Sequence, residues 1–272
     1  MLLGIDHLVI AVPDPDAAAA DLEAALGIAA TGGGRHAQAG TFNRLIFLGD
    51  TYLELIGVWD RALASGHPIG AAALAALDAG TPGLVTWAIA TDGACREVAA
   101  LRAAGSAIGD ALPGERIRQD GGVIRWHVAA AAPLAADRPP FLIEHELAGP
   151  EWGDEARRAR AAFVHPFGGQ ARVVGLELAV AHSAEVAADF ARTVGMAFRP
   201  APGVEPGDQE ARLGDQSIRL VSSGPGPGPR SGSSPGPGSG PTASDPTARV
   251  GLRATAGERL LVDLFGVRFA RL

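Results

Sequence analysis

The sequence predicts an α+β protein built from repeated units of one strand, one helix and three further strands. Three β-branched runs that lead into Ala-rich, helical text, at residues 4–12, 83–91 and 173–182, are the first observation. The second is that two hairpins, at residues 48–56 and 213–221, align without a gap and share a Gly-Asp turn. Four units in two pairs, the fourth degenerate, would account for all 272 residues.

Residues that end strands and cap helices mark the elements of the first unit. The strand at 4–12 ends at two prolines, and Asp16 is placed to cap a helix that closes at Gly27. The Gly-rich segment 31–40 is expected to form a tight or mobile loop, since a strand and not a helix follows it. The predicted hairpin strands are residues 41–48 and 51–58.

The later units follow the same order and suggest two domains, at residues 1–150 and 170–272, joined by a connector at 151–169. The segment 223–247 is almost wholly Gly, Pro and Ser and is predicted to be a flexible loop inside the second, degenerate domain. The remaining predicted elements are helical text at 61–79, 93–104, 151–163 and 183–194, and strands at 116–119, 123–128, 141–146, 248–254 and 259–269.

Composition excludes several classes of function. The net charge of -7 and the pI near 5.5 provide no basic surface for nucleic acid or an anionic membrane. No apolar run is as long as a membrane span, so a cytoplasmic protein is expected. The single cysteine, Cys95, excludes an internal disulfide framework, and the absence of lysine excludes Schiff-base chemistry and a P-loop. The Ala and Arg bias suggests a bacterial genome rich in GC.

A histidine in the first apolar strand is the leading functional candidate. Strand alternation places His7, Val9 and Ala11 on one face and leaves Leu8 and Ile10 on the other. An isolated buried histidine is more often structural. The carboxylate of Glu54, in the last strand of the same unit, favours a functional site that includes His7.

These residues resemble the vicinal oxygen chelate superfamily, in its glyoxalase-like branch. The resemblance rests on the opening Gly-Ile-Asp-His, on Gly-Arg-His at 34–36, on Gly-Thr at 40–41, on Asn-Arg at 43–44 and on Tyr-Leu-Glu-Leu at 52–55. It covers residues 1–222 and, more weakly, the tail. It implies that two units pair into a curved half-barrel around a site, with metal ligands from the first and last strands of each unit.

The resemblance implies a divalent ion, such as Zn, Mn, Fe, Ni or Mg, held by His7, Glu54 and Glu144, with Glu146 as an alternative to Glu144. The position that corresponds to His7 in the second unit is Thr86, or Trp87 if the register slips by one. His127 or His145 is a possible source of the missing nitrogen.

A metal with open positions would polarise a carbonyl, and Glu144 would move a proton at the adjacent carbon in a lyase or isomerase reaction. The substrate would be a small oxygenated metabolite, and the protein would act alone or as a homodimer. A non-catalytic protein that sequesters a small molecule such as an antibiotic is the alternative, and a partner-binding descendant without a ligand is a third. The expected substrate-binding residues are Arg35, His36, Asn43, Arg44, Tyr52, Trp87 and Trp126.

The third unit carries a different pair at the corresponding place. Glu177 and Arg219 fall near the positions of His7 and Glu54, so a carboxylate and a guanidinium are predicted to pair there. An arginine repels a cation. The hypothesis is that the first pair of units is the active half and the second is structural or dimerising.

Overall fold

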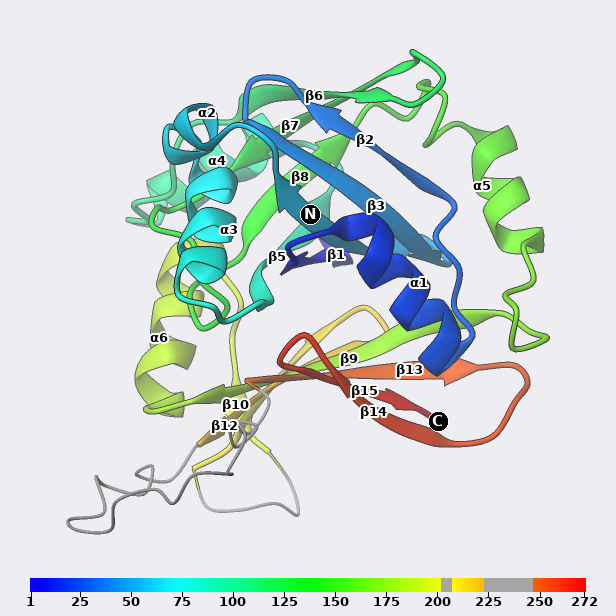
Figure 1. Cartoon of the computed structure of the whole chain (residues 1–272). Coiled ribbons are helices and arrows are strands. Elements are labelled where there is room, and N and C mark those ends of the chain that lie inside the picture. Colours follow the sequence, from blue (N-terminus) through cyan, green and yellow to red (C-terminus); the bar gives the residue numbers. More distant parts are fainter. Residues whose placement is uncertain (202–206, 223–246) are drawn as a thin grey trace, which may run out of the picture.

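We analysed a computed structural model that describes residues 1–201, 207–222 and 247–272. The first two units close into a single eight-stranded barrel, in the order β1-β4-β3-β2-β6-β7-β8-β5. A seven-stranded open sheet lies below it (Figure 1). The barrel strands are β1 (Leu2–Ala11), β2 (Gly32–His36), β3 (Thr41–Leu48), β4 (Thr51–Val58), β5 (Gly83–Thr91), β6 (Leu112–Arg118), β7 (Val123–Ala129) and β8 (Phe141–His145).

Strand pairing shows how the two units combine. β1 is parallel to β4 of its own unit and antiparallel to β5 of the second unit, and β5 is parallel to β8. The other seam joins β2 and β6, which are antiparallel and pair Gly34 with Arg118. The predicted repeat of strand, helix and three strands is therefore confirmed for both units.

The expected glycine loop is instead a barrel strand. Glycine is needed at Gly33 and Gly34 in β2 because neighbouring backbones come too close for a side chain. A Cβ on Gly33 would lie 2.4 Å from the carbonyl oxygen of Asn43, and one on Gly34 would lie 2.1 Å from that of Ile117. Glycine is thus required because β2 lies tightly between β3 of its own unit, at Gly33, and β6 of the second unit, at Gly34.

The helices lie outside the strands and follow their predicted positions with small changes. Asp14, and not Asp16, caps α1, because its side chain accepts the backbone N–H groups of Asp16 and Ala17. The helical text at 61–79 forms two helices that break before Pro68. The helices are α1 (Pro15–Leu26), α2 (Arg61–Ser65), α3 (Pro68–Asp78), α4 (Ala94–Ala103), α5 (Asp154–Ala162) and α6 (Ser183–Val194).

The second sheet contains the third and fourth units and has the order β10-β11-β12-β9-β13-β15-β14. The single strand predicted at 259–269 is two strands, because the chain turns tightly at Phe265 and Gly266, both with positive φ. The loop predicted at 223–247 lies, apart from Thr247, outside the described residues. The strands are β9 (Ala171–Val180), β10 (Arg199–Pro200), β11 (Gln209–Leu213), β12 (Gln216–Ser222), β13 (Ala248–Ala254), β14 (Leu260–Leu264) and β15 (Val267–Arg271).

The main hydrophobic core lies between the barrel and this sheet. Leu8 and Ile10 project from the outer face of β1 and pack with Leu22 of α1, Phe190 of α6 and Val250 of β13. Each of these side chains is fully buried. The opposite face of β1 therefore points into the barrel, as strand alternation requires.

Candidate functional site

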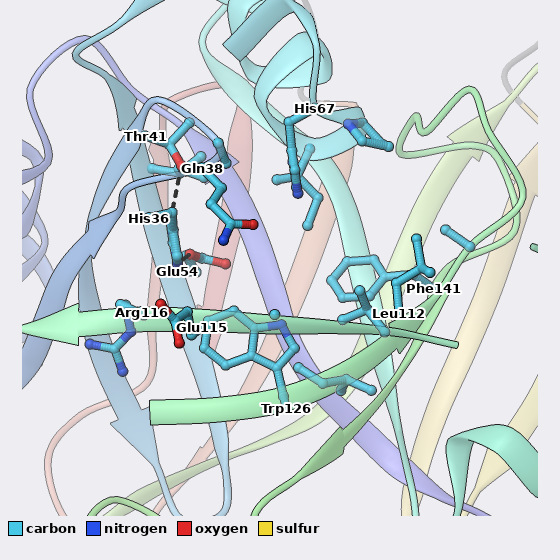
Figure 2. Close-up of a pocket in the computed structure, with 18 of the residues that line it drawn as sticks. His36, Gln38, Thr41, Glu54, His67, Leu112, Glu115, Arg116, Trp126 and Phe141 are labelled. Carbon is cyan, nitrogen blue, oxygen red and sulfur yellow. Dashed lines mark hydrogen bonds and ion pairs between the residues drawn. The ribbon is translucent and has the colours of Figure 1, made fainter. Parts of the chain in front are cut away.

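The interior of the barrel holds a cavity of about 460 Å³, within the usual range for small-molecule sites. Figure 2 shows its polar wall, formed by His36, Gln38 and Glu54, and the side chains of Trp126 and Phe141 across from them. His67, in the turn between α2 and α3, also lines the cavity. The apolar lining includes Leu45, Ile56, Ile69, Leu112, Ile124, Trp126, Val128, Leu134, Phe141 and Ile143.

A β-bulge at Asp6 determines which side chains of β1 meet the site. Across the β1–β5 ladder Ile5 pairs with Ile89 and His7 with Ala88, so Asp6 is an extra residue without its own partner. Such a bulge re-aims a side chain that simple alternation would send to the other face. As a result the side chain of Asp6 lies beside that of His7.

Asp6 is a buried carboxylate shared by two imidazoles. Its Oδ1 lies 2.6 Å from His7 Nδ1, and its Oδ1 and Oδ2 lie 3.1 and 3.0 Å from His145 Nε2. Burial alone would raise the pKa of Asp6, but His145 and His7 outweigh burial and hold this pKa below its usual range. Because the ionised carboxylate only accepts, both imidazole nitrogens donate to it.

This arrangement directs the second nitrogen of His7 at Glu54. His7 Nε2 lies 3.4 Å from Glu54 Oε2, and both side chains are buried. The Nδ1–H group of His7 already donates to Asp6. A hydrogen bond between His7 Nε2 and the carboxyl group of Glu54 therefore requires a proton on one of these two groups. That proton is on either the imidazole or the carboxyl group, so the pair is arranged to hold and transfer it.

Glu54 is itself oriented by Asn43. Asn43 Nδ2 donates to Glu54 Oε1 at 2.6 Å, while Asn43 Oδ1 accepts the N–H of Gly34 at 2.9 Å, so both ends of the amide are fixed. His36 Nε2 lies 3.8 Å from the same Glu54 oxygen, and His36 Nδ1 lies 3.0 Å from Thr41 Oγ1. Burial lowers the pKa of His36 to about 4, so this imidazole is neutral at pH 7.

Aromatic rings fix the plane of the His7 imidazole. Tyr52 stacks on it with ring centroids 4.5 Å apart, and Phe141 meets it edge-on at 5.3 Å. Burial, followed by the charges of Asp6 and Glu54, raises the pKa of Tyr52 well above its usual value, so the phenol stays protonated. His7 is thus held by a hydrogen bond and by packing on both ring faces.

The site residues expected from the sequence fall into two groups. Six of them, His7, His36, Asn43, Tyr52, Glu54 and Trp126, line the cavity together. The structure does not bring Glu144, Arg35, Arg44 or Trp87 to it, and all four lie on strand positions that face out of the barrel.

Glu144 needs the most important correction. On β8, Phe141, Ile143 and His145 line the cavity, so Glu144 projects outward. Its Oε2 accepts the N–H of Ala94 at 2.9 Å and caps α4, where the N-cap residue is glycine and offers no side chain. His145, one residue later, is the side chain that enters the site.

The other three outward residues have structural partners. Arg44 pairs with Asp16 of α1, and the guanidinium of Arg35 lies 5.6 Å from the ring centroid of Trp59. Trp87 is fully buried in the core between the barrel and the second sheet, near Phe190.

The donor groups do not fit the metal site that the resemblance implies. Within the described residues, no three His, Cys, Asp or Glu side chains are arranged to hold a metal ion. In the second unit Thr86 stands at the position of His7, and Ala88 therefore corresponds to Val9. Val9 pairs with Glu54 and Ala88 pairs with Phe141, so Phe141 stands at the position of Glu54. Two of the four ligand positions therefore carry side chains that do not bind metals well.

Several residues of the site were not predicted. The bulge that redirects Asp6 has no signal in simple alternation, although Asp6 is adjacent to His7. Arg116 of β6 is buried and donates from Nη2 to Glu151 Oε2 at 2.6 Å, a pairing across 35 residues that no local pattern reveals. Gln38 and His67 lie outside the strands, where no alternation indicates the direction of a side chain.

The ion pair predicted in the third unit is present. Arg219 and Glu177 are cross-strand partners on β12 and β9, with Arg219 Nη1 3.7 Å from Glu177 Oε2. Both side chains are about one-third exposed on the open sheet. A carboxylate at this place is therefore neutralised by a guanidinium.

Comparison with known proteins agrees with this geometry. The model of the glyoxalase-like domain matches residues 5–194, which is more than half of the chain. The chain belongs to the glyoxalase-like domain family. Its fold is the vicinal oxygen chelate fold. Comparison with curated protein sequences finds no match.

Solved structures resemble the chain to different extents. A hypothetical protein from Staphylococcus aureus has a TM-score of 0.72 and 15% sequence identity, and the match covers 98% of this chain and 99% of that one. A Streptomyces coelicolor methylmalonyl-CoA epimerase variant in complex with 2-nitronate-propionyl-CoA has a TM-score of 0.39 and 19% identity, over 54% of this chain and 99% of that one. The Mycobacterium tuberculosis methylmalonyl-CoA epimerase has values of 0.38 and 20%, over 53% and 88%.

None of the helices in the described ranges is long and apolar enough to cross a membrane.

Proposed function

We propose that this protein is a proton-transfer enzyme of the isomerase or lyase type that acts on a small oxygenated molecule inside the barrel. The observation that carries the proposal is the chain of contacts from Asp6 through His7 to Glu54 at the wall of the cavity. A buried carboxylate that shares a proton with an oriented imidazole is a general acid–base pair.

Glu54 would accept a proton from the carbon next to the substrate's carbonyl group. The electron pair of the broken C–H bond then forms an enolate, with negative charge on the carbonyl oxygen. Return of the proton to another carbon or to the other face gives an isomer, whereas departure of a group from the next carbon gives elimination. While Glu54 acts as the base, the proton that it shares with His7 would lie on His7 Nε2, and Glu54 itself would return the substrate's proton, with His7 held in place by Asp6.

Two neutral donors would stabilise the enolate oxygen. One donor would be His36. If the Thr41 hydroxyl donates to His36 Nδ1, the single proton of the neutral ring is on Nε2, on the side of the ring that faces Glu54. The amide of Gln38 reaches into the cavity beside it (Figure 2). Fixed donors inside a closed cavity stabilise developing charge more effectively than water does.

The test is deuterium incorporation at carbon, because this readout requires no knowledge of the product. A panel of small ketones, 2-oxo compounds and hydroxyketones is incubated with the protein in D₂O and followed by NMR. We expect at least one compound to exchange its α-protons faster with the wild type, and Glu54→Gln and His7→Gln to slow this exchange by on the order of 10²-fold or more. Glu185→Gln, an exposed change on α6, is the control.

Unchanged exchange in both variants would refute the assigned roles. The second candidate is sequestration without catalysis, which the broad apolar wall around Trp126 favours. It predicts saturable binding of a small molecule with no exchange above the uncatalysed rate.

A further inference from the structure

We propose that the barrel cavity selects an uncharged molecule, with an apolar body and a carbonyl or hydroxyl group at one end, and discriminates against anions. This inference rests on the proposed function, because it names the substrate class of the same site. It is argued from the charges that line the cavity.

The polar wall offers an anion no free positive charge. Glu54 is a carboxylate, and the neighbouring donors Asn43, Gln38 and Thr41 are uncharged. Four histidines line the cavity. His7 and His145 face the Asp6 carboxylate, and His7 also faces Glu54, so a proton on either ring is matched by a carboxylate. Burial lowers the pKa of His36 to about 4 and also lowers the pKa of His67, so these two rings are neutral at pH 7. A ligand carboxylate would therefore face Glu54 with no unpaired cation between them.

Among the described residues, Arg116 is the one arginine that lines the cavity, and Glu151 already neutralises its charge. Its Nη2 bonds Glu151 Oε2 at 2.6 Å, and both side chains are largely buried, with exposed fractions of 3% and 11%. Nη1 has no hydrogen-bond partner in the described structure, but it is buried from solvent. An anion approaching Arg116 would also approach Glu151, so the pair attracts it weakly.

The other nearby charges do not change this balance. Asp110 and Glu115 line the cavity as exposed carboxylates, and they pair with Arg102 at 2.7 Å and Arg125 at 3.8 Å. Arg35 and Arg44, the anchors expected from the sequence, lie outside the barrel. Each positive group in the described lining is therefore already paired with a carboxylate.

The remaining surface fits an apolar body. Leu112, Trp126 and Phe141 lie across from the polar wall in Figure 2, and the side chains of Val128 and Ile143 continue this surface. A ligand that spans the cavity would place its apolar part on β6–β8 and its oxygen near Glu54 and Gln38.

Three probes with one apolar body and different heads test this. They are 4-phenyl-2-butanone, which is neutral, 3-phenylpropionate, which is anionic, and 4-phenyl-2-butylamine, which is cationic. Binding to the full chain at pH 7 is measured by calorimetry and by the fluorescence of Trp126 and the other tryptophans. We expect the ketone to bind at least tenfold more tightly than the carboxylate. It should also bind more tightly than the amine, because Glu54 already pairs with Asn43 and His7, and burial of an ammonium group without a free partner costs free energy.

Variants distinguish the cause of the selectivity. Glu54→Gln should strengthen carboxylate binding about tenfold relative to ketone binding, whereas Glu185→Gln should not change this ratio. The paired change Arg116→Gln with Glu151→Gln keeps a hydrogen-bonded neutral pair and should preserve the order of the three probes.

Tightest binding of the carboxylate, lost in the Arg116 and Glu151 double variant, would overturn the proposal, and so would tightest binding of the amine. Failure of all three probes to bind would also overturn it. Selective ketone binding without deuterium exchange would support this proposal and refute the catalytic one.

Discussion

Acid should destabilise the protein through His36. Burial lowers the pKa of this imidazole from an ordinary value of 6.5 to about 4 in the folded protein. Between these values the unfolded chain binds a proton that the folded protein does not, so the free energy of unfolding falls as the pH falls. The stability is fully present above pH 6.5, and each lower pH unit removes about 1.4 kcal/mol, or roughly 3 kcal/mol by pH 4.

Urea denaturation at pH 7, 6, 5 and 4.5 measures this effect. His67 and His165, whose pKa values burial also lowers, add to the slope of the wild type in the same direction. We expect His36→Gln to reduce the loss of stability between pH 6.5 and pH 4.5 by about 2 to 3 kcal/mol relative to the wild type. The exposed His182→Gln is the control. Equal slopes in the wild type and His36→Gln would refute the neutral, buried state of His36.

Three further predictions address the rest of the site. Glu151→Gln leaves the charge of Arg116 buried and uncompensated, so it should lower the free energy of unfolding, measured by urea denaturation, by about 3–5 kcal/mol. Glu115→Gln, in an exposed pair, should lower it by less than about 1 kcal/mol. Similar losses in the two variants would contradict this account. Trp87→Ala should destabilise the protein by about 3–5 kcal/mol and leave probe binding within about twofold, and a large loss of binding would place Trp87 at the site. Untagged protein treated with a chelator should show the same melting temperature with and without one equivalent of Mn²⁺, Zn²⁺ or Ni²⁺. A rise of several degrees that is lost in His7→Ala would show a metal site that the donor geometry does not indicate.

The repeat made most of the fold predictable. The order of strands and helices along the chain and the hairpins follow from periodicity and from the shared turn at Gly49 and Gly214, which both have positive φ. The seam strand β2 could not be found this way, because the contact that requires glycine at Gly34 comes from β6, a strand far along the chain. Closure into one barrel is likewise a long-range property.

Face assignment limited the prediction of the site. His7 and Glu54 were found because each lies in a clear strand with a matching position in the repeat. Glu144 was misplaced because the resemblance assigned the ligand position to a carboxylate of the last strand, whereas the strand register places Phe141 there and His145 takes the inward position near the end of β8. Asp6 depends on a bulge that is defined only by pairing with β5.

The rates of α-proton exchange in Glu54→Gln and Glu144→Gln test the central claim most directly. Both variants replace a carboxylate by its amide, one at the cavity wall and the other at the cap of α4 outside the barrel. On a substrate that the wild type exchanges in D₂O, we predict a loss of on the order of 10²-fold or more for Glu54→Gln and a rate within about twofold of wild type for correctly folded Glu144→Gln. The reverse pattern would contradict the placement of the acid–base pair inside the barrel.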